Sequence, residues 1–254
     1  MFLISGILDA VDFLTIIKFG KEERKTENLK ASIKFFPVAG LFIGAVLAGV
    51  FYIFNKFSSI PLSVIFSLLC LFIITGGLHF DGLADTADGL FAYLKTGDKI
   101  RFYRAMKDVN TGFAGNAAVI FYILIIWAAV GGINIKFAYL SLFTFPLIGR
   151  YSIVLSSYFL NTPEYLKGTG TVFTEGTNLF TLIFASVLTV VITYLFLNLS
   201  GIFSLSVSAF AVLLSGLYFS RKFGGVNGDM LGFTVKMSEI VYMIALFGFY
   251  RVLS

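Results

Sequence analysis

Charged residues are scarce in this sequence. Only 13% of its 254 residues are Asp, Glu, Lys or Arg, whereas soluble globular domains carry about a quarter. Hydrophobic residues make up 58% of the chain, 31 of them Phe, and the mean hydropathy is +0.92. A soluble domain is therefore excluded, and the composition predicts an integral membrane protein.

Cysteine and signal-peptide features are scarce as well. The single cysteine, Cys70, excludes an internal disulfide and lies in an apolar run, where we expect it to pack as a small hydrophobic residue. No basic residue precedes the apolar stretch 1–17, and Asp9 and Asp12 interrupt it. We therefore expect an amphipathic segment at the membrane interface instead of a signal peptide. The net charge of +5 does not indicate nucleic-acid binding, because basic residues of membrane proteins set topology or meet anionic lipid.

Long apolar runs predict seven membrane-spanning helices, since a span needs about 20 mostly apolar residues. These runs cover residues 35–54, 60–78, 114–133, 137–160, 179–199, 201–220 and 238–253. The expected fold is an all-α, polytopic helical bundle that forms one catalytic domain over residues 1–254. Residues 1–34 would form an interfacial segment and residues 79–113 a catalytic loop.

The distribution of Lys and Arg predicts the orientation of the bundle. With seven spans, fifteen of the nineteen basic residues fall on the side of the N-terminus and three on the other. Basic residues concentrate in cytoplasmic loops. The sequence therefore predicts a multi-pass cell-membrane protein with a cytoplasmic N-terminus, an external C-terminus and an active site that faces the cytoplasm. This count places Lys236 in a cytoplasmic loop over residues 221–237.

Three aspartates carry the clearest chemical signal. Asp81, Asp85 and Asp88 are spaced i, i+4 and i+7, which places them on one face if the segment is helical. Aligned carboxylates repel one another unless a cation lies among them, and hard oxygen ligands favour Mg²⁺ or Mn²⁺. The plainer alternative is a solvated helix end. His79, the only histidine, is either a ligand or proton acceptor, or an interfacial residue.

Basic residues form a second set of candidates. Arg101, Arg104, Lys107 and Asp108 fall on one helical stripe that could hold phosphates, or could simply reflect the positive charge of cytoplasmic loops. Arg150 lies inside a predicted span, where an arginine either serves function or pairs with a buried acid.

Glycine-rich turns supply the remaining candidates. Lys167 precedes Gly168-Thr169-Gly170, which is as compatible with an ordinary loop as with an anion site. A second turn, with Gly225, Asn227 and Gly228, leads to Asp229, a metal ligand or a plain helix cap. Acids for a metal, together with basic residues and glycine loops for anions, are the equipment of phosphoryl transfer.

At this point the residues resemble one family. The run Gly-Gly-Leu-His-Phe-Asp-Gly-Leu-Ala-Asp-Thr-Ala-Asp-Gly at 76–89 is similar to the signature of cobalamin synthase, adenosylcobinamide-GDP ribazoletransferase. The resemblance continues in the family's order along the chain, through Phe13-Leu14-Thr15, Phe36-Pro37 with Gly40 and Gly44, Met106-Lys107-Asp108, Gly149-Arg150, Gly224 to Asp229, and Glu239.

The resemblance implies the last assembly of adenosylcobalamin. A hydroxyl of α-ribazole, or of its 5′-phosphate, would attack the phosphoryl group of adenosylcobinamide-GDP, and GMP would leave. It further implies Mg²⁺, with Mn²⁺ as the other candidate ion. Asp81, Asp85 and Asp88, with Asp229 as a further ligand, would hold the ion. Phosphates would meet Lys107, Arg150 and Lys167, and His79 or an aspartate would take the proton.

Other partner predictions follow from the composition and charge. The lipid bilayer is a predicted partner, nucleic acid is not, and association with further copies of the chain is left open. The chain departs from the family pattern at Asn110 and Asn227, where arginine and threonine are expected.

Two rival functions fit less well. Residues 85–92 partly match the Asp-x-x-Asp-Gly-x-x-Ala pattern of CDP-alcohol phosphotransferases, but Tyr93 replaces the arginine expected next and the downstream aspartate pair is missing. A cation transporter would need acids along an ion path through the membrane, whereas these acids gather at one predicted face.

Overall fold

The computed structural model describes residues 2–19, 26–166 and 168–253, and within them the chain is helical and contains no strand. The helices up to the first bend are α1 (Phe2–Leu14), α2 (Thr26–Ser32), the short 3-10 helix η1 (Ile33–Phe35), α3 (Phe36–Asn55) and α4 (Ile60–Thr75). After it come α5 (Leu78–Thr96), α6 (Lys99–Met106), α7 (Phe113–Gly131), α8 (Ile135–Phe159), η2 (Glu164–Leu166), α9 (Thr169–Gly176), α10 (Leu179–Phe223) and α11 (Gly228–Leu253).

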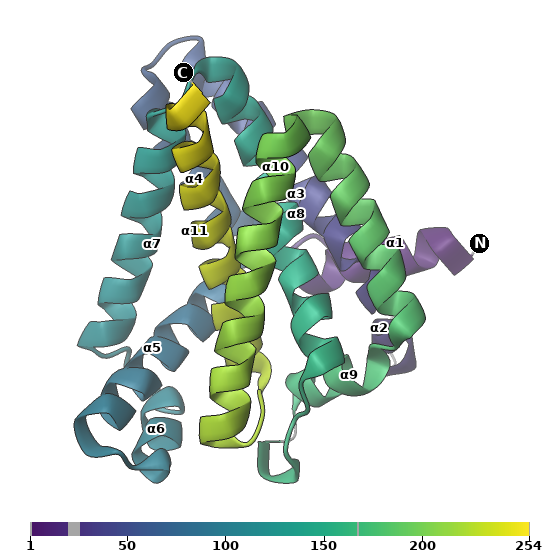
Figure 1. Ribbon diagram of the computed structural model, residues 1–254, viewed down its shortest axis with the longest axis vertical. Helices are drawn as coiled ribbons and strands as arrows, with labels where there is room; N and C mark the ends of the chain where they lie inside the picture. Colours follow the sequence, from purple (N-terminus) through teal and green to yellow (C-terminus); the bar gives the residue numbers. More distant parts are fainter. Residues whose placement is uncertain (1, 20–25, 167, 254) are drawn as a thin grey trace.

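The expected polytopic helical membrane fold is confirmed. Five helical segments of the described chain are long and apolar enough to cross a membrane, namely 26–55, α7, α8, α10 and α11. At about 1.5 Å per residue, the 45 residues of α10 are far too many for one crossing. The helix doubles back at Asn198, which has a φ of 49°, so that its two limbs run antiparallel (Figure 1). These limbs correspond to the predicted spans 179–199 and 201–220.

The second predicted span ends earlier than expected. Helix α4 stops at Thr75, and α5 leaves it at 93°. Gly76 and Gly77 make this bend with φ values of 57° and 73°, which glycine adopts without the steric cost of a side chain. Residues 79–96 therefore form a helix and not a loop. Helix α5 by itself is not among the described helices that are apolar enough to cross a membrane, and only together with α4 does it form a bent, broken or re-entrant span.

The last predicted span, 238–253, was placed too late. Helix α11 begins at Gly228, and both Lys236 and Glu239 are fully buried within it. Their charges lower the apparent hydropathy of the segment although they face each other inside the bundle. The assignment of Lys236 to a cytoplasmic loop was accordingly wrong.

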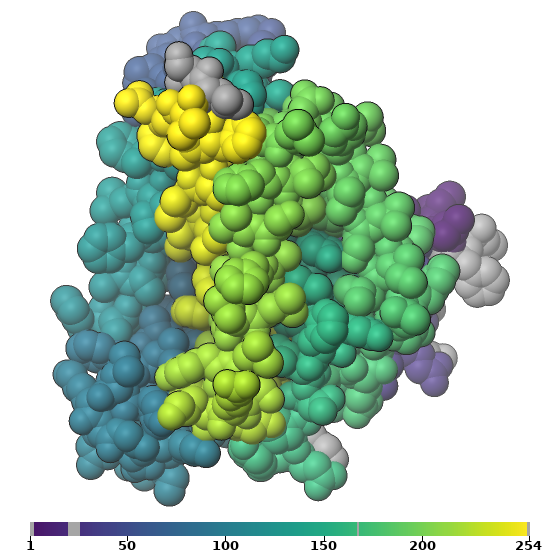
Figure 2. All heavy atoms as spheres, viewed as in Figure 1, coloured from purple at the N-terminus to yellow at the C-terminus, as the bar shows by residue number. Residues whose placement is uncertain are grey.

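Close helix contacts fix the positions of α8 and α11. A Cβ on Gly40 of α3 would lie 2.5 Å from the Pro146 carbonyl oxygen of α8, so these two helices touch through their backbones. Helix α11 packs on α5, α10, α8 and α7. Figure 2 shows α10 (green) covering much of α11 (yellow), which is most visible toward its C-terminal end.

One end of the bundle, here named the polar end, gathers α6, the loop before α7, the start of α9 and the turn before α11 (lower part of Figure 1). Most of the predicted site residues lie here. Helix α1 crosses beside the bundle at mid-height in the same view and packs on α2 and α3.

Candidate active site

The site forms where α5 crosses α11. Two glycines face each other at this crossing: a Cβ on Gly82 would lie 2.7 Å from the Asp229 carbonyl oxygen and 3.0 Å from the Gly232 Cα. Any larger side chain would push the helices apart. The close approach brings Asp229, from the far end of the sequence, beside the α5 residues Asp81 and Asp85.

A small cavity of about 90 Å³ lies at this crossing. His79, Asp81, Gly228 and Asp229 all line it, so the structure brings together four predicted residues from two separate motifs. Thr169 from the start of α9 also lines it. The His79 side chain is buried, and among the described residues its Nδ1 has no hydrogen-bond partner. His79 is thus a candidate proton acceptor beside this cavity.

Asp85 is half-buried between the other acids. Burial, and then the neighbouring charges of Asp81, Asp229 and Asp88, raise its pKa from 3.8 to about 6. The charges of the other three carboxylates therefore reach Asp85. A divalent cation would relieve that repulsion.

Asp88 has a defined structural partner. Its two carboxylate oxygens accept the backbone N–H groups of Gly112 and Gly115, at 2.7 and 2.8 Å. Gly112 is the N-cap of α7, and it has no capping side chain of its own. Asp88 therefore supplies the cap from another helix and ties α5 to α7, a role that the i, i+4, i+7 spacing did not predict.

The acids suit a metal that also binds substrate. Within residues 2–19, 26–166 and 168–253, no three acidic, cysteine or histidine side chains converge into a preformed metal cage. Mg²⁺ is commonly held by one or two carboxylates together with substrate phosphates and water, so such a cage is not needed. Asp81 and Asp229 on the shared cavity, with Asp85 beside them, fit this mode of binding, whereas both oxygens of Asp88 are already in use.

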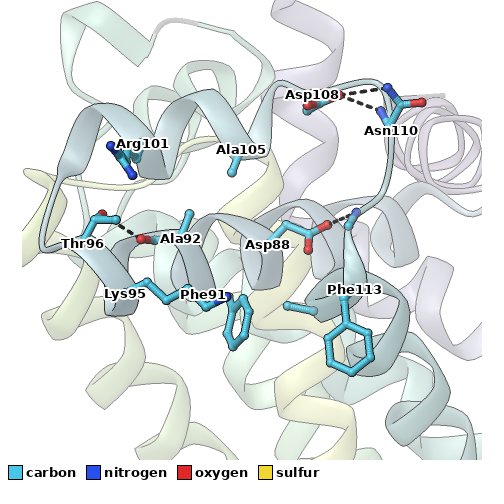
Figure 3. Close-up of a pocket in the computed structure, with 12 residues that line it drawn as sticks. Asp88, Phe91, Ala92, Lys95, Thr96, Arg101, Ala105, Asp108, Asn110 and Phe113 are labelled. Atoms are coloured by element: carbon cyan, nitrogen blue, oxygen red, sulfur yellow. Dashed lines mark hydrogen bonds between the residues drawn. The ribbon is translucent and has the colours of Figure 1, made fainter.

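The basic residues line the outer part of the polar end. Arg101, Arg104, Lys107 and Asp108 are exposed on α6 and just after it. A cavity of about 390 Å³ lies between α5, α6 and the start of α7 (Figure 3), lined by Asp88, Lys95, Arg101, Asp108 and Asn110 among others. Asp108 accepts the backbone N–H and the side-chain amide of Asn110, which shapes the loop. Lys95 and Arg101 give this cavity two cations.

The glycine turn before α11 serves mainly to start that helix. Asn227 Oδ1 accepts the Met230 N–H at 2.9 Å, and its Nδ2 donates to Asp229 Oδ2 at 3.2 Å. Gly225 has a φ of 151°, and Gly228 lies against the Thr169 hydroxyl, which a Cβ would approach to 2.6 Å. Asn227 thus caps α11 and orients Asp229. The predicted phosphate contact at Lys167 falls outside the described residues.

The expected phosphate role of Arg150 is not supported, and the alternative of a buried ion pair is what the structure shows. The Arg150 side chain is 0% exposed, and its Nη1 donates to Glu239 Oε1 at 2.7 Å. Lys236 Nζ donates to Glu239 Oε2 at 3.0 Å, and the Tyr122 hydroxyl donates to the same oxygen at 2.6 Å. This buried ionic cluster (Tyr122, Arg150, Lys236 and Glu239) joins α7, α8 and α11.

The sequence did not identify Tyr122 or Lys236 as partners of Arg150 and Glu239. Glu239 entered the sequence analysis as the last residue of the family resemblance, whereas Tyr122 and Lys236 gave no signal as partners of Arg150. Gly149 leaves the space that the Glu239 carboxylate fills, since a Cβ there would lie 3.0 Å from the Glu239 Cδ. A glycine beside an intramembrane arginine, with an acid in a later span, is the only sequence trace of this arrangement.

The fold and site together define a polytopic membrane protein whose acidic centre and cationic cavity lie at one end of a helical bundle. Residues 6–247 match the cobalamin-5-phosphate synthase family, and the chain belongs to that family.

Curated relatives agree along the whole chain. The chain is 30% identical over 240 residues to an adenosylcobinamide-GDP ribazoletransferase of Clostridium novyi, covering 94% of this chain and 95% of the relative. It is 32% identical to proteins of the same name from Geotalea daltonii, over 93% of this chain and 94% of the relative, and from Fusobacterium nucleatum, over 94% and 95%. No solved structure matches the chain.

Proposed function

We propose that this protein transfers the adenosylcobinamide-phosphate group of adenosylcobinamide-GDP to α-ribazole or its 5′-phosphate, with release of GMP. The observation that carries the proposal is the convergence of His79, Asp81 and Asp229 on one cavity at the α5–α11 crossing, in a chain whose relatives bear the transferase name over nearly their full length.

The reaction forms one bond and breaks another at a single phosphorus. The acceptor hydroxyl oxygen bonds to the phosphorus that carries the cobinamide arm, and the bond from that phosphorus to the oxygen bridging to GMP breaks. GMP takes the bonding electron pair. The hydroxyl proton passes to a base beside the cavity, and we assign this role to His79, which lines the cavity and whose Nδ1 has no hydrogen-bond partner among the described residues.

Mg²⁺ is the metal this site would take. Asp81, Asp85 and Asp229 would hold it, and its charge would offset the negative charge that develops on the phosphate oxygens of the leaving GMP. The remaining cations of the site stand apart from these acids. Lys95 and Arg101 line the larger cavity nearby and offer contacts for the diphosphate of the donor.

The surroundings are part of the same proposal. We place the polar end on the cytoplasmic side of the cell membrane, because most basic residues fall on that side of the chain. Both substrates would then reach the site from the cytoplasm.

A reconstituted assay tests the reaction. Purified protein in lipid nanodiscs is given adenosylcobinamide-GDP, α-ribazole and Mg²⁺, and GMP and the corrinoid product are quantified. We expect equimolar products, and loss of at least a hundredfold in rate with Asp81→Asn or with excess chelator. Absence of product with the native protein, beside an active relative assayed in parallel, would refute the reaction. Full activity in chelator would refute the metal.

A further inference from the structure

A third cavity, larger than the two described above, lies under the bend between α4 and α5. Its volume is about 630 Å³, within the range of roughly 300–1,000 Å³ typical of small-molecule sites. Three phenyl rings line it, those of Phe13, Phe72 and Phe80, together with Asp81 and Asn116. This space is named here the bend pocket.

The bend pocket ends at the acidic centre. Phe13, Leu78 and Asp81 line both this pocket and the small cavity that holds His79 and Asp229. A molecule whose body filled the bend pocket would therefore present its polar end at Asp81. The two spaces together have the form of a binding pocket that leads to a reaction centre.

The aromatic wall is held rigid from behind. Phe80 packs edge-to-face against both Phe72 and Tyr122, with ring centroids 5.6 and 5.2 Å apart. Lys236 of the buried ionic cluster lies over the Phe80 ring at 4.0 Å. A preformed aromatic wall lowers the entropic cost of binding a flat ring.

The bend itself is fixed as well. The Ile16 N–H donates to the Ile74 carbonyl at 2.8 Å, which holds the end of α1, and with it Phe13, against the bend. On the opposite rim, Asn116 Nδ2 donates to the Gly112 carbonyl at 3.1 Å, so the amide is oriented.

We propose that the bend pocket binds the aromatic base of the acceptor nucleoside and directs its ribose toward Asp81. This inference rests on the proposed function. A flat, largely apolar base with a hydroxyl-bearing sugar matches aromatic walls that end at a carboxylate. None of the described lining residues is Lys or Arg, so the pocket does not suit the diphosphate of the donor. A lipid chain would leave Asp81 facing hydrocarbon.

Two variants test the assignment. Phe72 is 51% exposed, so Phe72→Ala should fold, and it removes one stacking surface; we expect the KM for α-ribazole to rise about tenfold. Val119→Trp should fill the pocket. Equilibrium dialysis of the nanodisc-embedded variant with α-ribazole, in the absence of the donor substrate, should then detect no binding. With both variants the KM for adenosylcobinamide-GDP should stay within about twofold.

A matched control lies next to Phe72. Ile73 is on the same helix and 54% exposed, but does not line the pocket, so Ile73→Ala should leave both KM values unchanged. An unchanged acceptor KM in both Phe72→Ala and Val119→Trp would overturn the inference. So would release of a co-purified lipid by Val119→Trp without any effect on α-ribazole. Failure of native protein to bind or use α-ribazole would instead refute the proposed function.

Discussion

Each oxygen of the Asp88 carboxylate is already engaged by a backbone N–H at the start of α7, at 2.7 and 2.8 Å. An ionised acceptor at a helix N-terminus is favoured by the helix dipole as well as by the hydrogen bonds. Asp88 is therefore a structural residue whatever it contributes to metal binding, and its loss should be felt in the absence of substrate.

Asp88→Asn should lower the free energy of unfolding by about 1.5–3 kcal/mol, because the amide can accept at one atom only and its NH₂ group would oppose an N–H. Thermal unfolding in detergent with EDTA measures this. Asp98→Asn is the matched control: Asp98 also caps a helix, accepting the Ile100 N–H at 2.8 Å, but Asn caps a helix about as well as Asp, so this change should alter stability by less than about 0.5 kcal/mol. Equal stability of native protein and Asp88→Asn would contradict the capping role.

Asp85 should make the metal-free protein less stable as pH rises. Its folded pKa of about 6 exceeds the ordinary 3.8, so the folded state binds the proton more tightly than the unfolded state. This contribution is fully present below pH 3.8 and is lost as pH rises through 6. Melting temperatures across this window in EDTA should fall more for native protein than for Asp85→Asn. Parallel curves would show that folding does not raise the pKa of Asp85.

At the scale of helices, the α5–α11 crossing depends on two glycines. A Cβ at Gly82 would lie 2.7 Å from the Asp229 carbonyl oxygen, so Gly82→Ala should separate the helices, lower stability by about 1–3 kcal/mol and reduce turnover. Gly49→Ala on α3 is the control, because nothing lies within 4 Å of its Cβ position. Stability by thermal unfolding and activity at saturating substrate are the measurements. Native turnover in Gly82→Ala would mean that the close crossing is not needed.

The buried ionic cluster also acts between helices. Two cations and one carboxylate meet here with 0% exposure, so Glu239→Gln leaves both cations uncompensated. Breaking such a pair typically costs about 3–5 kcal/mol, whereas removing all its charges together is often tolerated. The triple variant Arg150→Met, Lys236→Met and Glu239→Gln should therefore unfold at a higher temperature than Glu239→Gln alone. The reverse order would exclude charge compensation as the role of Glu239.

The sequence predicted a helix correctly where the exposed side chains are apolar. It misplaced a helix where charged side chains pair with each other inside the bundle. Hydropathy located both limbs of α10 because most of their exposed residues are apolar. It misplaced the start of α11, since Lys236 and Glu239 cancel each other in the interior, a relation between partners that a hydropathy profile does not contain. Likewise, helical spacing placed Asp81 and Asp85 together, but the capping role of Asp88 required knowing where α7 begins relative to α5.

At the scale of the whole molecule, the order of the spans places the polar end and the opposite end on different sides of a membrane. The α7–α8 turn, with Lys136 at its edge, lies far from the loop of Asn110, at the two ends of α7. The excess of basic residues on the side of the polar end predicts that Asn110 is cytoplasmic and Lys136 external.

Single cysteines at these two positions decide the orientation. In a Cys70→Ser background, a membrane-impermeant maleimide should label Lys136→Cys in intact cells, and Asn110→Cys only after the membrane is permeabilised. Cys70 lies in α4 and is only partly exposed, so its removal should not disturb the polar end, and retained activity of the Cys70→Ser protein verifies this. Labelling of Asn110→Cys in intact cells would reverse the topology and place the proposed reaction on the external face, where the basic residues would no longer account for the orientation.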